Sequence, residues 1–517
     1  MLLSWSLFLA YVIVTFYLAW LGQKKTHSLE SYAIGNRDMS PWVVGMALAA
    51  SMTSTATFVI NPGIIYAYGI SGILGYGVSA GLGLMLGIVI LSKGFRKYGL
   101  PAAAITVPQW IGTRYNDQRM TLFYALVNLL LIAMVVLICY AMASLLVATL
   151  RLPRLIPNYS FEVALMITIV FVFTYIFFGG TYAHAYTNTV QGLIMIAVAA
   201  TLIASGLHLF DGQFIQRLRD LDPNLASVTN PKSLLFRHWF EVFVVNFLVG
   251  FALTVQPHFI IKSLYVKSDR DVNLYLGVAV LIGTLFSMVL LCGLYARVEA
   301  SEFINKFITV NKMGVDGVIP AYIIQTFSPT VGVLISIAIL AAGMSTLDGI
   351  LVALSAIFAN DVFLVINRNS NKSSKEDRRQ LAFKVSRYSL IAFGILAFAL
   401  SLMQHYYKEF SVAIFAQEGV YALFAATFVP VLFGMFVRNI SKGIVFVASV
   451  GALVVHFSFR YGKLSVLTNA DYTNPGLTAA YGLMVSLAIV GGYFLVRNFR
   501  PNNRKIGRVA GKVESRE

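Results

Sequence analysis

Apolar runs of about twenty residues, separated by short polar segments, recur along the whole 517-residue chain. An α-helix rises 1.5 Å per residue, so about 20 apolar residues cross the roughly 30 Å hydrocarbon core of a bilayer. The pattern therefore predicts an all-α polytopic membrane protein with thirteen spans. We expect these spans at residues 4–22, 41–69, 70–93, 119–150, 161–179, 187–210, 237–262, 272–296, 330–366, 383–403, 410–436, 442–460 and 476–497.

The second and seventh runs are interrupted by residues that disfavour a regular helix. In the second, hydroxyl side chains crowd residues 51–57 and an Asn-Pro-Gly sequence follows at 61–63; in the seventh, Thr, Gln, Pro and His lie within 254–258. Proline removes a backbone hydrogen bond and glycine loosens the turn. Each break alone could be a proline kink stabilised by neighbouring helices. Two breaks at matching places in two groups of five spans, 2–6 and 7–11, favour an inverted-repeat transporter whose broken helices carry the binding site.

The composition excludes an ordinary soluble enzyme. Hydrophobic residues make up 58% of the chain and charged residues 12%, whereas soluble domains carry about 25% charged residues. Cys139 and Cys292 both lie inside apolar runs, so no disulfide framework or thiolate metal site is predicted. The seven histidines lie mostly at span ends without the spacing of metal ligands, which argues against an intramembrane enzyme.

The net charge of +17 indicates how the chain is oriented in the membrane. If the N-terminus is outside, 27 of the 39 Lys and Arg residues fall in inner loops and the tail, as the retention of basic residues in cytoplasmic loops predicts. We therefore expect a single transmembrane domain over 1–497 and a cytoplasmic basic tail over 498–517. The tail is either solvated or in contact with anionic lipid head groups. The first run lacks a preceding basic region and a cleavage pattern, so we expect it to be retained as a span.

The ninth run contains the small residues 341–344 followed by Ser345, Thr346 and Asp348. Two neutral hydroxyl oxygens suit Na⁺, especially if backbone carbonyls freed by the first break, near Ala50 and Thr53, point to the same place. The alternative is that both hydroxyls bond carbonyls of their own helix. Asp348 is costly within a span, so it is expected either to pair with an inner basic residue or to lie on an ion exit path. Glu418 in the eleventh run raises the same question.

The chain resembles the sodium:solute symporter family, which includes carriers of proline, sugars, pantothenate and monocarboxylates. Five motifs in order carry the resemblance: Ala50-Ser-Met-Thr53 leading to Pro62-Gly63; Gly179-Gly180 followed by Thr187-Asn188 and Gln191-Gly192; Pro257-His258 with Lys262 and Lys267; Ala341-Ala342-Gly-Met-Ser345-Thr346; and Phe433-Gly434 with Arg438 and Lys442-Gly443. The resemblance implies a LeuT-type 5+5 inverted repeat with thirteen spans, broken in spans 2 and 7.

The resemblance also implies the residues of an ion site and of a substrate site. In the family, Na⁺ is held by two carbonyls of the first broken helix and by one carbonyl and two hydroxyls of the ninth span. Carried onto this chain, the Na⁺ ligands are Ala50, Thr53, Ala342, Ser345 and Thr346. By the same analogy, the substrate residues are Ser54, Thr57, Phe58, Phe251, Thr254, Phe415 and Gln417.

Three positions depart from the pattern of the family. Asn188 stands where many members have an Asp proposed to serve the inner ion path, Lys262 where many have Arg, and Met52 where some have Asp. Asn188 and Asp348 are expected on the ion path. Lys262 could attract an anionic solute, or it could anchor the span by extending to the cytoplasmic edge of the membrane.

These features predict a Na⁺-coupled secondary active symporter in the inner membrane, with no enzymatic activity, that imports a small organic solute. A carboxylate such as pantothenate, a monocarboxylate or an amino acid is the expected solute, with Na⁺ as the co-transported ion and a monomer as the expected state. The alternatives are an H⁺-coupled carrier of similar solutes or a transporter-like membrane sensor. A channel is compatible with the composition but does not require paired broken helices.

Overall fold

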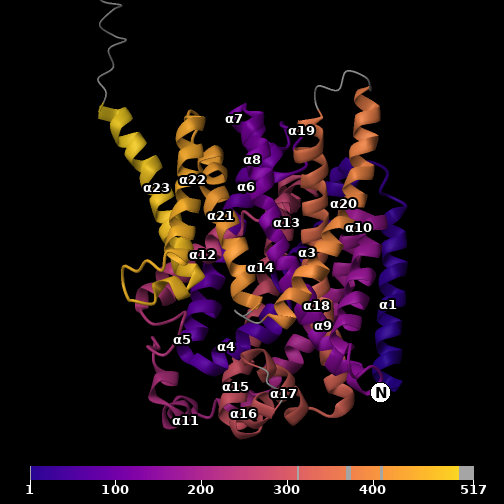
Figure 1. Cartoon of the computed structure of the whole chain (residues 1–517), viewed down its shortest axis with the longest axis vertical. Helices are drawn as coiled ribbons and strands as arrows, with labels where there is room; N and C mark the ends of the chain where they lie inside the picture. The colour runs from indigo at the N-terminus through magenta and orange to yellow at the C-terminus, as the bar shows by residue number, and fades with distance from the viewer. Residues whose placement is uncertain (1, 311–313, 368–373, 408–411, 500–517) are drawn as a thin grey trace, which may run out of the picture.

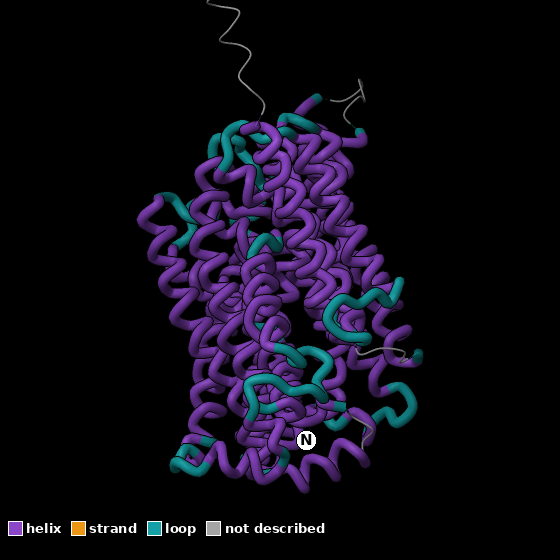
Figure 2. Tube along the Cα trace, turned by 90° about the vertical axis from the view of Figure 1, so that its left-hand side faces the viewer, coloured by secondary structure: helices purple, strands orange, loops and turns teal. Residues whose placement is uncertain are grey.

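The computed structural model describes residues 2–310, 314–367, 374–407 and 412–499. Helices and loops make up the described residues, with no β-strand among them. The helices run mostly along the long axis of the molecule, and most loops gather towards its two ends (Figures 1 and 2). The basic tail predicted over 498–517 lies, apart from its first two residues, outside the described residues.

The long unbroken helices are flanked by shorter helical turns. The long helices and the turns that continue them are α1 (Leu2–Gln23), η3 (Ile73–Ala80), α6 (Gly81–Gly99), α8 (Gln118–Asn128), η4 (Leu129–Leu131), α9 (Ile132–Thr149), α10 (Ser160–Ser205), α14 (Asp269–Ser287), η10 (Met288–Leu291), α15 (Cys292–Glu299), α18 (Pro329–Ile357), η12 (Phe358–Phe363), α19 (Leu364–Ile366), α20 (Lys375–Tyr406), α21 (Val412–Phe436), α22 (Lys442–Tyr461) and α23 (Pro475–Phe499). The short helices between them include α2 (Leu29–Ile34), α5 (Ile70–Gly72), α7 (Val107–Tyr115), α11 (Phe214–Leu221), α16 (Ser301–Val310), α17 (Val318–Thr326) and η13 (Asp471–Thr473).

Both predicted breaks are present. The first separates α3 (Pro41–Met52) from η2 and α4 (Ala56–Ile60, Asn61–Tyr68), which bend away by 52°. The second separates η8 and α12 (Phe240–Val245, Asn246–Leu253) from α13 and η9 (Pro257–Ile260, Ile261–Leu264), with a bend of 62°. The first break falls at residues 53–55, before the Asn-Pro-Gly sequence, and Pro62 lies at the start of α4, directly after the π-helical turn η2.

Ten of the described helices are long and apolar enough to cross a membrane, or up to twelve if each broken pair is one span. The count differs from the thirteen predicted spans because α10 covers two of them, at 161–179 and 187–210. Within α10, Gly180 has φ 55° and ψ −143°, outside the helical region. The Gly180 kink lies beside the loop after α1, since Thr26 donates to Gly179 O (2.9 Å) and Thr181 to Tyr32 O (2.7 Å).

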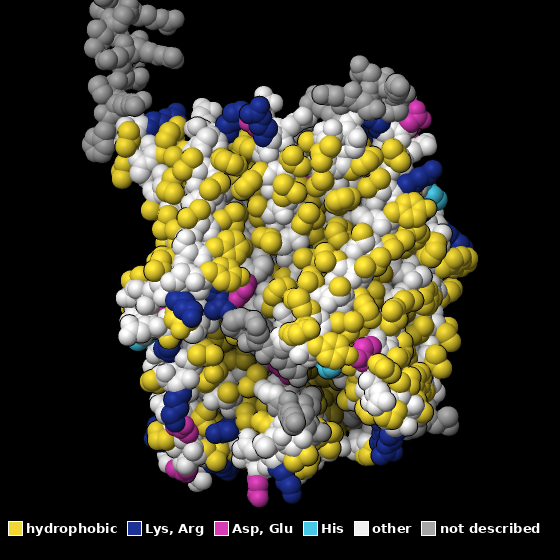
Figure 3. All heavy atoms as spheres, viewed as in Figure 1, with side chains coloured by type: hydrophobic (Ala, Val, Ile, Leu, Met, Phe, Trp, Pro, Cys, Tyr) yellow, Lys and Arg dark blue, Asp and Glu magenta, His cyan; other side chains and the backbone are white. Residues whose placement is uncertain are grey.

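Apolar side chains cover much of the face seen in Figure 3, whereas Lys and Arg gather towards the two ends of the molecule. Large apolar residues such as Ile13, Leu281 and Ile395 are exposed on the long helices, at 68%, 74% and 68% of their surface. Such exposure would be costly in water and is expected where lipid covers the helices. The helix bundle therefore has the surface of a membrane protein.

A side chain at Gly180 should destabilise the kink in α10. A Cβ there would lie 2.6 Å from Cδ2 of Tyr32, and the positive φ disfavours any L-residue. We expect Gly180→Val to lower the melting temperature of the purified protein, with a cost of about 1–3 kcal/mol from backbone strain alone. Gly277→Ala on α14 is the matched control, because its Cβ would meet nothing within 4 Å. Equal melting temperatures for the two variants would show that a side chain at position 180 does not strain the kink.

Candidate functional site

A cavity of about 240 Å³ lies between the two breaks. Side chains from both broken helices line it, together with residues of η3, α6, α9, α14, α18 and α21. No Asp, Glu, Lys or Arg lines the cavity among the described residues. Its polar lining consists of Ser51, Thr53, Ser54, Thr57, Asn61, Tyr76, Asn246, Gln256, His258, Ser287, Thr346, Gln417 and Tyr421. The cavity therefore offers hydrogen bonds to a solute but no fixed charge apart from the ionisable ring of His258.

Oxygen atoms from α3 and α18 converge beside this cavity. The Ser345 hydroxyl donates to Ala50 O at 2.9 Å and to Ala342 O at 2.8 Å, so it lies between the end of α3 and its own helix. Ala50, Ala342 and Ser345 are completely buried. Three of the five predicted Na⁺ ligands are thus within hydrogen-bond distance of one another, in a place that excludes water.

Thr346 and Thr53 complete the predicted set. The Thr346 hydroxyl donates to Ser51 O at 3.0 Å and lies 3.5 Å from Ala342 O. Thr53 is the residue that ends α3, with φ −115° and ψ 90°, and its N–H donates to Ala50 O at 3.2 Å. Both hydroxyls of α18 therefore bond their own helix, as the alternative prediction states, and also bond the unwound end of α3. A bound cation could replace these donated hydrogens and use the same oxygen lone pairs.

Asn188 supports the ion site from α10. Its amide donates to Ser345 O at 3.1 Å and to Ser51 Oγ at 3.2 Å, while its own carbonyl oxygen has no hydrogen-bond partner. Asn188 is fully buried. The Asn188 side chain thus contacts Ser345 of the predicted site and Ser51 beside it, and keeps one neutral oxygen free.

Lys262 lies inside the protein and does not extend to the membrane edge. Its side chain is completely buried, and its ammonium group donates to Ser51 Oγ (2.9 Å) and to His258 O (3.0 Å). The predicted alternative of a cytoplasmic-edge anchor is therefore wrong for this residue, because the bend at Pro257 turns the second half of the helix towards α3. Lys262 reaches the residue that follows the predicted Na⁺ ligand Ala50.

Asp348 is buried on α18, one turn beyond Ser345. Its carboxylate accepts hydrogen bonds from the hydroxyl groups of Tyr175 and Thr187, the latter at 3.3 Å, both on α10. No ion pair joins it to a basic residue in the part of the chain that the structure describes. Glu418 differs, because it accepts a hydrogen bond from Arg460 of α22 at 2.6 Å and one from Tyr461 at 3.1 Å. Glu418 thus holds α21 against α22, while Asp348 stays beside the ion site.

The predicted substrate residues divide into two groups. Ser54, Thr57 and Gln417 line the cavity. The other four predicted residues do not line the cavity: Phe58, Phe251, Thr254 and Phe415. Phe58 packs against Phe286, with ring centroids 6.1 Å apart, and Phe251 packs against Phe428, with ring centroids 5.8 Å apart. Because η2 is a π-helical turn, its side chains point in other directions than they would in a regular α-helix.

Several lining residues were not among the predicted ones. Asn61 and Gln256 stand directly before the two prolines that mark the broken helices, and that position is a signal the sequence carries. Tyr76 comes from the π-helical η3 and Tyr421 from α21, and neither has a sequence signal, because both are aromatic residues within ordinary apolar runs.

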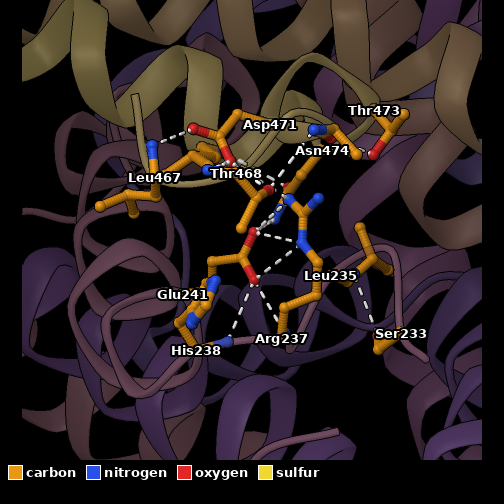
Figure 4. Close-up of polar contacts among 12 residues, drawn as sticks. Ser233, Leu235, Arg237, His238, Glu241, Leu467, Thr468, Asp471, Thr473 and Asn474 are labelled. Carbon is orange, nitrogen blue, oxygen red and sulfur yellow. Dashed lines mark hydrogen bonds and ion pairs between the residues drawn. The ribbon is translucent and has the colours of Figure 1, made fainter. Parts of the chain in front are cut away.

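A second polar cluster holds the start of η8 against the loop before α23 (Figure 4). Arg237 and Glu241 form an ion pair at 2.5 Å, with side chains that are 8% and 0% exposed. Asn474 donates to Glu241 at 3.2 Å, and Asp471 lies 3.9 Å from Arg237. The first half of the second broken helix is thus tied to the last helical hairpin.

Asp471 organises the loop that precedes α23. Burial acts to raise the pKa of its carboxyl group, but hydrogen bonds from the Thr468 side chain and from the N–H groups of Leu467, Val466 and Thr468 lower the pKa below its ordinary value of 3.8. Because the pKa of this carboxyl group is lower in the folded state than in the unfolded state, its ionised form stabilises the folded state at pH values above the unfolded-state pKa. This stabilisation is lost as the pH falls from there through the folded-state pKa. At neutral pH the carboxylate therefore keeps the loop in place.

A sequence model of the sodium:solute symporter family matches residues 32–451, which include both broken helices and the ninth predicted span. The chain is 26% identical to the sodium/pantothenate symporter of Haemophilus influenzae over 395 residues, 76% of this chain and 77% of that protein. It is 25% identical to a sodium/proline symporter of Staphylococcus aureus over 453 residues, 86% of this chain and 83% of that protein.

The fold is also found in solved structures. A Na⁺-coupled sialic acid symporter, solved in a substrate-bound outward-open state, superposes with a TM-score of 0.75 and covers 96% of this chain and 98% of its own, at 18% identity. A nucleobase-cation-symport-1 family transporter in a closed conformation gives a TM-score of 0.54 at 13% identity, covering 91% of this chain and 95% of its own. At these identities the similarity establishes the fold alone.

Proposed function

The chain belongs to the sodium:solute symporter family, and on that basis we propose that it imports a small organic carboxylate together with Na⁺. The sodium/pantothenate and sodium/proline symporters to which it is similar both carry solutes of this class. The family consists of transporters, so no enzymatic activity is part of the proposal. Na⁺ acts as the second substrate and is not a resident cofactor.

One observation carries the proposal: the cavity and the ion site share residues. Thr53 and Thr346 are both predicted Na⁺ ligands and lining residues of the cavity. A solute in the cavity is therefore next to the bound ion. No Asp, Glu, Lys or Arg lines the cavity among the described residues, so a Na⁺ ion held at Thr53 and Thr346 supplies a positive charge at the cavity wall for a carboxylate. Each ligand then strengthens the binding of the other, as coupling requires.

The size of the cavity limits the solute. Its volume of about 240 Å³ is below the range of about 300–1,000 Å³ that is usual for pockets of drug-sized ligands. A compact carboxylate or amino acid fits this space. Larger solutes would require the helices around the cavity to move.

Na⁺ coupling supplies the energy for accumulation. An inward charge moving through about 100 mV releases about 2.3 kcal/mol. A tenfold Na⁺ gradient adds about 1.4 kcal/mol. One Na⁺ per neutral solute thus supports accumulation of about a few hundredfold; a monovalent carboxylate entering with one Na⁺ carries no net charge and draws on the Na⁺ concentration gradient alone.

We further propose that α10 crosses the membrane twice, which brings the count to thirteen spans in a 5+5 repeat with the N-terminus outside and the C-terminus in the cytoplasm. Three observations support this topology. Residue Gly180 interrupts α10 near its middle, a continuous helix of 46 residues would be about 69 Å long, and α1 and α23 reach opposite ends of the molecule (Figure 1). The excess of basic residues on one side supports this orientation. The inner membrane and a single transmembrane domain acting as a monomer are part of the same proposal.

Thermal stabilisation of the purified protein identifies the solute. The panel contains pantothenate, monocarboxylates, proline, sugars and sialic acid, each in NaCl and in choline chloride. A ligand that binds only the folded state raises the melting temperature. We expect a carboxylate to raise it only in NaCl. A shift of the same size in choline chloride would point to H⁺ coupling or a sensor instead.

A lining hydroxyl should contribute to solute affinity without affecting Na⁺. Thr57 lines the cavity and is not among the predicted Na⁺ ligands. We expect Thr57→Val to raise the solute concentration for half-maximal uptake about 3- to 10-fold, the loss of one hydrogen bond of about 0.5–1.5 kcal/mol. Thr201→Val on α10 is the matched control, since Thr201 is exposed and bonds only Ala197 O. An unchanged half-maximal concentration in Thr57→Val would remove Thr57 from the site.

A further inference from the structure

Several buried polar atoms near α18 have no hydrogen-bond partner. They are Oδ1 of Asn188, both ring nitrogens of His184, Nδ1 of His258 and Oδ2 of Asp361. All four residues are at most 2% exposed. An unsatisfied buried polar group costs about 1–3 kcal/mol and calls for an explanation. Of these residues, only Asn188 contacts the predicted ion site, and it does so through its amide N–H groups.

Two of these residues lie next to α18, beside Asp348. A Cβ at Gly349 would lie 3.1 Å from Cε1 of His184 and 3.4 Å from Cβ of His258, so the His184 ring and the first carbon of the His258 side chain lie beside α18 at the residue after Asp348. A neutral imidazole nitrogen and an amide oxygen can both accept a hydrogen bond from water or contact a cation. These groups therefore offer acceptors beside the part of α18 that follows Ser345 and Thr346.

A small cavity continues from the imidazoles along α18. It has a volume of about 10 Å³ and is lined by His258 and Gly349 at one end and by Thr106 and Ile357 at the other. Residues 349–357 of a helix span about 12 Å. The space is about the size needed for one water molecule. It leads away from the ion site towards the end of the molecule where α7 and α19 lie (Figure 1).

Asp361 follows one turn beyond the end of this cavity. It lies in the π-helical turn η12, a kind of distortion that is frequent at functional sites. One carboxylate oxygen accepts a hydrogen bond from the Asn360 amide at 2.6 Å, and the other has no partner. No Lys or Arg forms an ion pair with it among the residues that the structure describes. A buried carboxylate without a counter-charge is expensive, so a mobile cation would relieve that cost.

The short helix α2 lies beside the small cavity. Ala33 lines the small cavity, and Leu29 packs in one apolar cluster with Ala359, two residues before Asp361. The Tyr32 hydroxyl and the Ser355 hydroxyl of α18 are 3.1 Å apart. The short helix α2 thus covers the small cavity, whereas η12 with Asp361 packs against α8 and α20.

We propose that Asp361 is a cation-binding station on the path by which Na⁺ leaves the ion site for the cytoplasm. The ion passes from Ser345 and Thr346 to the free oxygen of Asn188, then past His184 and His258, and pairs with Asp361 before it enters the cytoplasm. The path rests on the proposed Na⁺ site and orientation. Asp361 touches the ion only after release begins, so it affects the rate of net transport and not the affinity of the ion site.

Two fluxes in proteoliposomes separate these roles. Net uptake of labelled pantothenate, and separately of labelled proline, is driven by an inward Na⁺ gradient and requires Na⁺ release inside. Exchange of labelled for unlabelled solute at saturating Na⁺ on both sides does not. We expect Asp361→Asn to slow net uptake about tenfold, equivalent to about 1.4 kcal/mol in the release barrier, and to change exchange and the Na⁺ midpoint of thermal stabilisation less than twofold.

Three further variants make the test specific. Asp361→Glu keeps the charge and should recover most of the net uptake, whereas Asp361→Ser should behave like Asp361→Asn, so that the result does not depend on the folding of one variant. Asp377→Asn, an exposed carboxylate that caps α20, is the matched control and should leave both fluxes unchanged. A parallel loss of net uptake and exchange, or no loss of either, would overturn the assignment of Asp361. Absence of Na⁺-dependent uptake in the unaltered protein would instead contradict the proposed function.

Discussion

Replacing Ser345 with alanine should raise the Na⁺ concentration for half-maximal uptake about tenfold or more, equivalent to at least about 1.4 kcal/mol. The Ser345 hydroxyl lies 2.9 Å from Ala50 O and 2.8 Å from Ala342 O, at the centre of the oxygens proposed to hold the ion. Alanine removes one ligand from a site that water cannot reach. Thr346→Ala should have a similar effect, whereas Thr346→Ser keeps the oxygen and should retain most of the Na⁺ affinity. Uptake of the solute as a function of NaCl, with choline chloride as balance, measures all three.

Ser336→Ala is the matched control for these variants. Ser336 lies on the same helix, α18, and its hydroxyl bonds only Gly332 O, at 2.9 Å. Its Na⁺ dependence should equal that of the unaltered protein. If Ser345→Ala and Thr346→Ala also keep that dependence, the two hydroxyls do not bind the ion and the site has to be placed elsewhere.

Removing the charge of Glu241 should destabilise the protein severely. Arg237 and Glu241 are buried together at the start of the second broken helix (Figure 4), and one guanidinium nitrogen of Arg237 already lacks a partner. Breaking such a pair leaves the buried Arg237 with only the more distant Asp471, 3.9 Å away, as a counter-charge; breaking a buried pair typically costs about 3–5 kcal/mol. We expect Glu241→Leu to yield little monodisperse protein and a markedly lower melting temperature.

The double variant Arg237→Met/Glu241→Leu tests the reason for this loss. Replacing both partners by apolar residues removes the unpaired charge, so the double variant should be more stable than Glu241→Leu alone. Size-exclusion profiles and melting curves compare the stability of the parent protein, Glu241→Leu and the double variant. A Glu241→Leu variant as stable as the parent, or a double variant no better than the single one, would show that the ion pair does not hold the start of the helix.

The membrane spans and both breaks could be predicted from the sequence, because they depend on local properties. Apolar runs of sufficient length become helices in a bilayer, and Pro257 prevents the helix from continuing. The place of the first break was harder to predict. Pro62 is the visible helix breaker, yet the chain unwinds at residues 53–55, where hydroxyl side chains bond the backbone and α18 provides partners from far along the sequence.

The residues around the cavity were harder to predict because their orientation depends on tertiary structure. Phe58 was expected to face the solute, but the π-helical turn η2 rotates it into the core beside Phe286. Lys262 is another example, since nothing local shows that the bend of its helix brings it to Ser51. The Na⁺ ligand set came from the resemblance of short motifs, and the structure brings Ala50, Ala342, Ser345 and Thr346 to one place.

Solute uptake into proteoliposomes under an imposed Na⁺ gradient tests the central claim most directly. The purified protein is reconstituted, and labelled pantothenate or proline is added outside with NaCl or with choline chloride, at equal ionic strength. The account predicts accumulation above the outside concentration only with inward NaCl, and its collapse when the gradient is dissipated by a Na⁺ ionophore. Accumulation of the same size in choline chloride would contradict Na⁺ coupling and with it the role assigned to the oxygens between α3 and α18.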